Sequence, residues 1–291
     1  MSLPFQVQTT RGAMVESVHR VSCVVRHRSG AVVATSGETP PLTWWRSAAK
    51  PFQALPLVQD GGAERFALDN ADLAIACASH SSEPGHLAAV ERFMAKVGVS
   101  ESDLVCGPHP PLSAEVHRGL LRSGQEPTPR WSNCSGKHTA MLALARLHGW
   151  SLEGYHEPNH PVQLRIAREI ASWAEVPPES LAVSTDGCAT TCFGLPLEGM
   201  ALAWARLGAS PEPATARLRA SILANPWLIA GTGRPCTEIM EAWPDQVMTK
   251  IGAEGVYGAA IPALELGIAL KVDDGDMRAS AIALVAVLQQ L

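Results

Sequence analysis

Residues 43–58, TWWRSAAKPFQALPLV, place Ser47 three positions before Lys50, with a proline directly after the lysine. We predict a helix here, because a proline in the first turn costs little: the first N–H groups of a helix lack intrahelical partners in any case. Ser47 then lies at the helix N-terminus, and Lys50 lies one turn on, on the same face. Such a pair can act as nucleophile and base once the lysine pKa falls from about 10.4 towards about 7–8. Since an isolated Ser-x-x-Lys recurs by chance, the rest of the chain must decide.

A second lysine motif lies near the other end of the chain. Lys250-Ile251-Gly252 falls in a predicted strand and resembles the Lys-Thr-Gly of serine β-lactamases and penicillin-binding proteins. The order along the chain also agrees, with Ser-x-x-Lys early on a helix and Lys-x-Gly late on a strand. The Ser-Asp-Asn element that those enzymes carry between the two is missing. In its place stands CASHSSEPGH, residues 77–86, which is either a hydroxyl-rich catalytic loop or a serine-rich helix cap.

Composition excludes several classes of function. The chain has 291 residues, 18% of them charged, and a formal net charge of −5, which argues against a nucleic-acid or polyanion partner. The start, MSLPFQVQTTRGAMVES, lacks the basic and apolar parts of a signal peptide, and no run approaches the roughly 18 apolar residues of a membrane span. Seven scattered cysteines, an odd number, do not suit a disulfide framework. We therefore expect a cytoplasmic protein with no membrane partner.

The periodicity of the chain predicts an α/β (α+β) protein. Strands are expected over 14–25 and 31–38, helices fill the middle, and strands over 246–263 and 266–276 precede a C-terminal helix. The two chain ends most simply pair into one antiparallel sheet, from about 11–38 and 245–291, with a helical part over about 44–240 as an inserted subdomain. We expect one domain over residues 1–291.

Two polar stretches contain cysteines. WSNCSGKHTAM, residues 131–141, places Cys134 and Lys137 one helical turn apart with His138 next, and STDGCATTCFGLPL, residues 184–197, holds Cys188 and Cys192. These cysteines are either core residues or ligands of a soft divalent metal, zinc first. By residue chemistry His138 is a better zinc ligand than Lys137, because lysine binds a metal only as the neutral amine.

Taken together, these pieces resemble one family. RGAMVESVHR (11–20), RSAAKPFQALPLV (46–58), ASHSSEPGH (78–86), WSNCSGKHTAML (131–142), STDGCATTCFGLPL (184–197) and VMTKIGAEGVYGAAI (247–261) are similar to the asparaginase II family of rhizobial type. The likeness runs from about residue 11 to the C-terminal helix. It implies a serine β-lactamase-like fold and an L-asparaginase, an amidohydrolase that converts L-asparagine to L-aspartate and ammonia. We also expect a homodimer.

The resemblance implies two serine–lysine pairs and a zinc site. Ser47 with Lys50 matches the first pair, and Ser79 with Lys250 matches the second. The zinc position of the family falls on Cys134, Lys137 and Cys188, which leaves Cys192 as a spare. Arg46 and His138 are candidates to bind the α-carboxylate and the α-amino environment of the substrate, although Arg46 could equally form a surface ion pair.

The predicted reaction is acyl transfer. Ser47 attacks the side-chain amide carbon with Lys50 as general base, Ser79 and Lys250 carry the proton onward, and water releases aspartate. If serine is the nucleophile, zinc orients the substrate rather than activating water. Two alternatives stay open: another β-lactamase-like amidohydrolase or acyltransferase, and a zinc-stabilised binding protein without catalysis.

Overall fold

The computed structural model describes residues 5–38, 40 and 42–291, and its centre is an antiparallel sheet built from both ends of the chain. The strand order is β1-β2-β9-β8-β7, with β3 paired to β2 on the same side as β1. The contact between the two ends is β2 against β9, in register from Val21↔Val272 to His27↔Leu266. The predicted fold is confirmed in this respect. Residues 1–4, which begin the stretch without signal-peptide features, lie outside the described residues.

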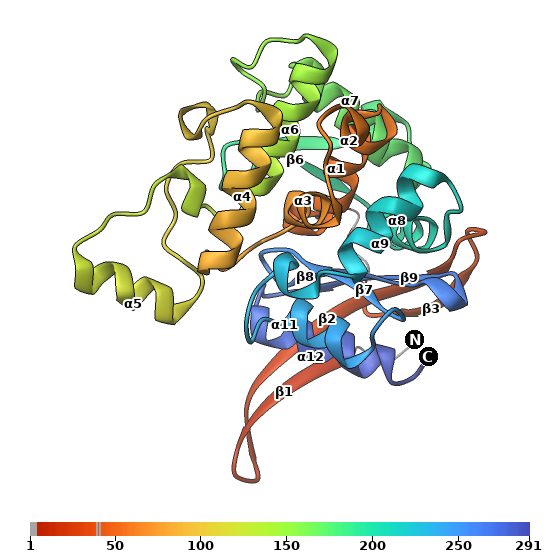
Figure 1. Ribbon diagram of the computed structural model, residues 1–291. Helices are drawn as coiled ribbons and strands as arrows, with labels where there is room; N and C mark the ends of the chain where they lie inside the picture. The colour runs from red at the N-terminus through yellow and green to blue at the C-terminus, as the bar shows by residue number, and fades with distance from the viewer. Residues whose placement is uncertain (1–4, 39, 41) are drawn as a thin grey trace.

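The strands and helices follow one another as two ends of sheet around a helical middle (Figure 1). The large sheet consists of β1 (Phe5–Arg11), β2 (Met14–His27), β3 (Val32–Ser36), β7 (Met248–Ile251), β8 (Val256–Ile261) and β9 (Leu266–Val272). A small second sheet consists of β4 (Thr43–Trp44), β5 (Ala182–Thr185) and β6 (Thr191–Leu195). The α-helices are α1 (Lys50–Gln59), α2 (Gly62–Arg65), α3 (Asn70–Ala76), α4 (Pro84–Val97), α5 (Ala114–Ser123), α6 (Ser135–His148), α7 (Pro161–Ala174), α8 (Leu197–Ala209), α9 (Pro213–Leu223), α10 (Pro226–Ile229), α11 (Pro235–Ala242) and α12 (Met277–Leu288). Short 3-10 turns are η1 (Arg46–Ala49), η2 (Glu101–Asp103), η3 (Pro129–Trp131), η4 (Pro178–Ser180) and η5 (Pro262–Leu264).

The two faces of the large sheet are covered by different helices (Figure 1). α8 packs on one face, where the indole of Trp204 leaves no room for a side chain at position 258. Lys250 is directly opposite Gly258, so its side chain points to this same face. α12 packs on the other face. Lys250 therefore faces the helical part of the molecule, and α12 lies behind it.

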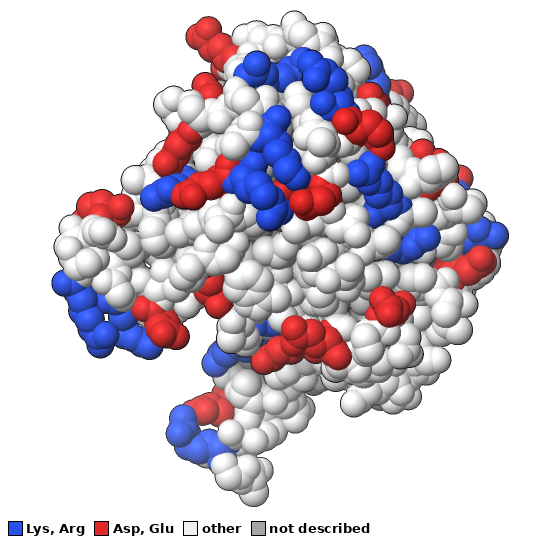
Figure 2. Space-filling view, in the orientation of Figure 1, with Lys and Arg blue, Asp and Glu red and all other residues white. Residues whose placement is uncertain are grey.

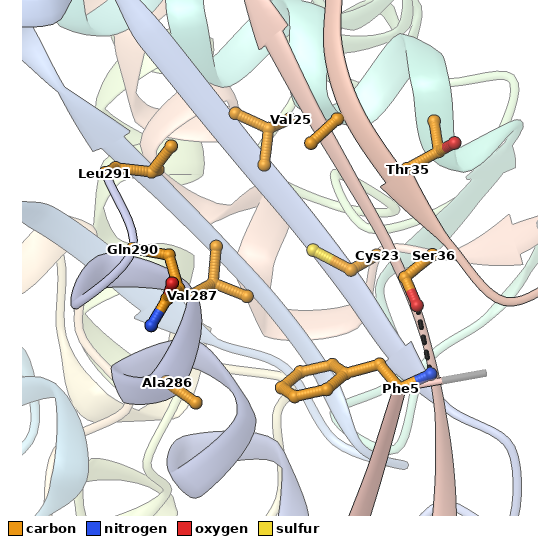
Figure 3. A pocket seen from close by; sticks show the side chains of 10 residues that line it. Phe5, Cys23, Val25, Thr35, Ser36, Ala286, Val287, Gln290 and Leu291 are labelled. Carbon is orange, nitrogen blue, oxygen red and sulfur yellow. Dashed lines mark hydrogen bonds between the residues drawn. The ribbon is translucent and has the colours of Figure 1, made fainter. Parts of the chain in front are cut away.

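An apolar cavity of about 320 Å³ lies on the α12 face, between that helix and β1–β3 (Figure 3). Cys23 and Val25 line it from β2, and Phe5 closes one side, with its backbone N–H donating to Ser36 Oγ at 3.0 Å. Successive residues of a strand point to opposite faces, and Val24 between them belongs to the row of Gly258 and Lys250. The sheet therefore separates this cavity from Lys250.

The helical middle packs around α1, which carries Lys50 as its first residue. Trp45, Phe52 and Trp204 form a chain of edge-to-face contacts, with ring centroids 5.1 Å and 5.6 Å apart, that joins α1 to α8. Both signs of charge are interspersed over the helical part on the face in Figure 2, as the small net charge implies. Among the described residues, no helix is long and apolar enough to cross a membrane.

Candidate active site

Ser47 lies in η1, the tight turn that leads into α1. The residue before it, Arg46, has φ of 49°, a left-handed backbone that non-glycine residues rarely adopt and that is concentrated at functional sites. The end of β7 packs directly on this turn: a Cβ at Gly252 would stand 2.9 Å from the Trp45 carbonyl oxygen and 3.4 Å from the Ala48 nitrogen. Glycine at this position thus allows the strand with Lys250 to approach the Ser47 turn.

Ser79 lies between two buried lysines. Its Oγ is 2.9 Å from Lys50 Nζ and 2.8 Å from Lys250 Nζ. Lys50 Nζ also donates to the carbonyl oxygens of Ala78 and Asn133, and Lys250 Nζ to that of Ile251. Three segments far apart in the sequence therefore converge on one hydroxyl: the start of α1, the loop after α3, and β7.

The two lysines share a dry environment, being 0% and 1% exposed. Burial lowers the pKa of Lys250 to about 7, and the positive charge of Lys50 contributes in the same direction. No carboxylate lies within ion-pair distance of Lys250 among the described residues. A substantial fraction of Lys250 is therefore the neutral amine at neutral pH.

A third buried lysine, Lys137, stands beside the cysteines named above. Its Nζ is 2.9 Å from Cys188 Sγ. A hydrogen bond from Cys134 and the charge of Lys137 lower the pKa of Cys188 to about 5, although burial opposes the shift. The hydrogen bond to Cys188, together with burial, raises the pKa of Cys134 to about 12. Cys134, Lys137 and Cys188 thus come together as one cluster, with Cys188 as its thiolate.

The cluster offers two sulfur donors and one nitrogen donor, a combination that suits zinc. No group of three or more His, Cys, Asp or Glu side chains in the described part of the chain could hold a metal ion. A zinc site here accordingly needs Lys137 as its third ligand, and binding would displace a proton from Lys137 and one from Cys134. Cys192 lies apart in β6, with its thiol hydrogen-bonded to the backbone of Arg46.

The two residues expected to bind substrate have different partners. Arg46 Nε donates to Asp186 Oδ1 at 2.9 Å. Of the two possibilities considered for Arg46, the structure therefore shows the ion pair. Burial alone would raise the pKa of Asp186, but the charges of Lys137 and Arg46 outweigh it and lower that pKa. The Arg46 side chain is 26% exposed and that of Asp186 12%. Asp186 places a carboxylate between the Ser47 turn and the Cys188 cluster.

His138 is completely buried, and its Nδ1 lies 2.6 Å from the hydroxyl of Tyr155. That hydroxyl also accepts the Val105 N–H, and we assign its own proton to the hydrogen bond with His138 Nδ1. The imidazole proton then sits on Nε2, which has no hydrogen-bond partner in the described structure. Burial lowers the pKa of His138 well below its usual value, so the ring is neutral. His138 is next to the cluster along α6 and presents a free N–H donor.

The sequence assigned no role to several residues that contact the site. Asp186, Asn133 and Tyr155 contact Arg46, Lys50 and His138 respectively. Asp186 stands two residues before Cys188 in a polar loop, and this was the available signal for it. Asn133 acts through its carbonyl oxygen, and Tyr155 comes from a distant segment, so neither leaves a local pattern.

The fold recurs among solved structures, of which 53 chains match. The crystal structure of Mglu in its native form has a TM-score of 0.50 at 14% identity, covering 91% of this chain and 62% of that one. Mglu in its glutamate form gives 0.53 at 14%, covering 93% and 60%. A β-lactamase from Mycobacterium bovis gives 0.44 at 12%, covering 93% and 94%. The chain thus spans about three fifths of the length of the Mglu chains and has their fold.

Sequence comparison addresses the family. A search of curated proteins finds no match. The model of the family described as L-asparaginase II matches residues 7–291, which is nearly the whole chain. The predicted α/β fold with an antiparallel sheet and the predicted family are both confirmed: the chain belongs to the L-asparaginase II family.

Proposed function

We propose that this protein is an L-asparaginase that hydrolyses L-asparagine to L-aspartate and ammonia through a Ser47 acyl-enzyme. An amidohydrolase role follows from the family. The observation that carries the finer proposal is the Ser79 hydroxyl, placed 2.8 and 2.9 Å from two buried lysine nitrogens beside the Ser47 turn. Such an arrangement can move a proton away from a serine nucleophile without a histidine.

The first step transfers the Ser47 proton. Lys50 Nζ already donates to three acceptors, so it can accept the Ser47 proton once one of its own protons has been passed on. Ser79 receives that proton while giving its hydroxyl proton to the neutral amine of Lys250, whose pKa is lowered to about 7 mainly by burial. The Ser47 oxygen then attacks the side-chain amide carbon. Lys250 is the proton sink in this mechanism.

The second step expels ammonia and releases the acid. The one proton gained by Lys250 returns through Ser79 and Lys50 to the leaving nitrogen, which departs as ammonia, and Lys50 is again an ammonium group. Water then attacks the Ser47 ester, gives its proton to the same relay, and aspartate leaves with Ser47 restored. A backbone N–H group at the start of the Ser47 turn, where no side chain caps the helix, can stabilise the developing oxyanion.

Substrate recognition is assigned to the pair of Arg46 and Asp186 with His138. Arg46 uses Nε for Asp186, which leaves its terminal nitrogens for the α-carboxylate of an amino acid. Asp186 can accept a bond from the α-ammonium group. His138 offers its unpartnered Nε2–H as a neutral donor to the substrate. A charged pair facing a zwitterion accounts for preference for a free amino acid over a peptide.

Zinc is part of the proposal as a group held by Cys134, Lys137 and Cys188. When bound, it would supply a Lewis acid that polarises and orients a substrate oxygen. The lowered pKa of Cys188, to about 5, supports this, because the thiolate is the form that binds metal.

We also propose a cytoplasmic location, supported by seven unpaired cysteines, and a homodimer, supported by the exposed Met277 and Ile282 on α12. Light scattering of the purified protein tests the dimer.

L-Glutamine is the second candidate substrate. A solved structure with the same fold is a glutamate form of Mglu, and glutamate is the acid that hydrolysis of glutamine would produce. The experiment is ammonia release from asparagine, glutamine and a β-lactam panel. Asparagine should be the best substrate, with a Ser47 acyl adduct detected by mass spectrometry after acid quench. Turnover of glutamine or a β-lactam alone would reassign the substrate, and no turnover of any would favour a binding protein.

A further inference from the structure

Arg234 lies beside the serine–lysine pairs and has no part in the mechanism above. It is the residue that precedes α11, and it is partly buried. Its Nη1 donates to Ser81 Oγ at 3.3 Å, and Ser81 Oγ in turn donates to the Ala230 carbonyl oxygen at 2.7 Å. Ser81 is two residues from Ser79. Arg234 is therefore docked on the loop that carries the central hydroxyl of the site.

The segment around Arg234 is tied to both members of the second pair. The Ser79 backbone N–H donates to Ile229 O at 2.9 Å. Cys236 Sγ accepts the N–H of Ile251, the residue after Lys250, at 3.1 Å. Residues 229–236 thus contact the Ser79 loop on one side and the end of β7 on the other. Arg234 belongs to this segment, and its charge acts on Lys250 without a hydrogen bond between the two.

Arg234 has no ion pair of its own in the described structure, and the Glu83 carboxylate near Ser81 is bonded to Thr232. Within the described part of the chain, no carboxylate lies within ion-pair distance of Arg234, whereas Arg46 on the other side of the site is paired with Asp186. An unpaired cation in a partly dry setting acts over a longer range than a paired one. Its field therefore reaches the neighbouring amine.

We propose that Arg234 is a positioning residue of the Ser79–Lys250 pair: it holds the Ser79 loop through Ser81 and supplies a permanent positive charge that favours the neutral amine of Lys250. The inference rests on the proposed function, because it concerns the proton relay of that reaction. Arginine suits this task because it stays protonated at every working pH.

The groups that face Lys250 make this role specific. Lys50 approaches from α1 and Arg234 from the start of α11, and these are the two cations. Cys236, Cys134 and Cys77 complete the set from α11, the start of α6 and the end of α3. Burial is the largest cause of the lowered Lys250 pKa, and the charges of Lys50 and Arg234 add to it. Lys50 loses and regains a proton during the relay, so Arg234 is the cation whose charge stays constant.

The test compares Arg234→Gln, Arg234→Lys and, as a matched control, Arg219→Gln. Arg219 is also an arginine bound to backbone oxygens, those of Leu207 and Ser210, and does not face Lys250. We expect Arg234→Gln to move the acidic limb of kcat/KM for asparagine to higher pH by roughly half a unit to one unit. KM on the alkaline plateau should stay within about twofold of the wild-type value. Arg234→Lys should bring the acidic limb most of the way back to its wild-type pH.

Each other outcome has a definite meaning. A raised KM with an unmoved limb would show that Arg234 contacts the substrate and would overturn the proposal. An unmoved limb with a lowered melting temperature would show a purely structural role and would also overturn it. If the wild type hydrolyses no amide, the proposed function fails separately. The Arg234 inference is then decided by the NMR titration of ¹³C-labelled lysine, where Arg234→Gln must raise the Lys250 midpoint.

Discussion

Lys137 and Lys250 are both almost completely enclosed, at 2% and 1% exposure, yet their pKa values shift in opposite directions. Burial by itself lowers the pKa of both. At Lys137 the negative charges of Cys188 and Asp186, together with the hydrogen bond to Cys188, outweigh burial, and its pKa is raised. At Lys250 the positive charges of Lys50 and Arg234 add to burial, and its pKa falls to about 7.

The difference assigns separate tasks to the two lysines. A lysine that is neutral near pH 7 can accept a proton, whereas a lysine held by a thiolate keeps its proton until a metal replaces it. This difference supports the proposed roles of Lys250 in proton transfer and of Lys137 in the proposed metal cluster. Three of the five lysines in the chain, Lys50, Lys137 and Lys250, lie in this one site.

We expect the largest loss of activity when the proposed nucleophile, Ser47, is replaced. Ser47→Ala removes the proposed nucleophile, and kcat/KM for asparagine should fall by roughly 1,000-fold or more. The fold should stay intact, because Ser47 is only partly buried. Ser180→Ala, a change at an exposed serine, is the control and should retain full activity. Ammonia release by the purified variants decides this, and substantial activity in Ser47→Ala would reject the assignment.

The next effect concerns the proton acceptor itself. Lys250→Met should lower kcat/KM by about 100- to 10,000-fold, the range of general acid–base catalysis. It should also move the remaining acidic limb to higher pH, because one positive charge leaves a pocket in which like charges disfavour protonation. The measurement is kcat/KM against pH in wild type and variant, with zinc saturating. A limb that stays in place would contradict the coupling of the two lysines.

Metal removal tests the Lys137 side of the comparison. We expect about one zinc ion per chain. Cys134→Ser and Cys188→Ser should lose the ion, and Cys192→Ser should keep it, because Cys192 lies in β6 outside the cluster. Elemental analysis of the three variants gives the answer. Zinc that persists in the first two variants and disappears from the third would reverse the ligand assignment.

The smallest effect is expected behind the sheet. Cys23 is 4% exposed and lines the apolar cavity on the α12 face, where burial raises its pKa to about 12. Cys23→Ser should cost about 1–3 kcal/mol of stability, because a hydroxyl replaces an apolar thiol. Activity at low temperature should be unchanged. Thermal unfolding and ammonia release on the same sample check both points. A large loss of activity in folded protein would show that the cavity on the α12 face affects the active site on the other face of the sheet.

Much of this fold follows from periodicity and motif order. The expected strands over 14–25 and 266–276 are β2 and β9, which pair as anticipated, and the terminal helix is α12. β1 was missed, because FQVQTTR is largely polar and its strand is decided by pairing with β2. The β5–β6 hairpin carried no strand prediction, because its glycines and threonines resemble turn residues and its partner β4 lies far away in sequence.

The sequence names candidate residues of the site but does not show which of them contact one another. The motifs and the resemblance named Ser47, Lys50, Ser79 and Lys250, and the structure places Ser79 within hydrogen-bond distance of each of the two lysines. The sequence could not show that Ser79 lies between both lysines, because this depends on three segments meeting in space. The pairing of Arg46 with Asp186, 140 positions apart, is tertiary in the same sense.

The proposed mechanism needs Lys250 to be the neutral lysine of the site and Lys137 the charged one. ¹³Cε-labelled lysine gives five resonances, and Lys250→Met and Lys137→Met assign the two that matter. In metal-free protein we predict that the Lys250 resonance titrates with a midpoint near 7. The Lys137 resonance should keep the shift of an ammonium group to about pH 10. A Lys250 resonance that also stays an ammonium to about pH 10 would contradict the account.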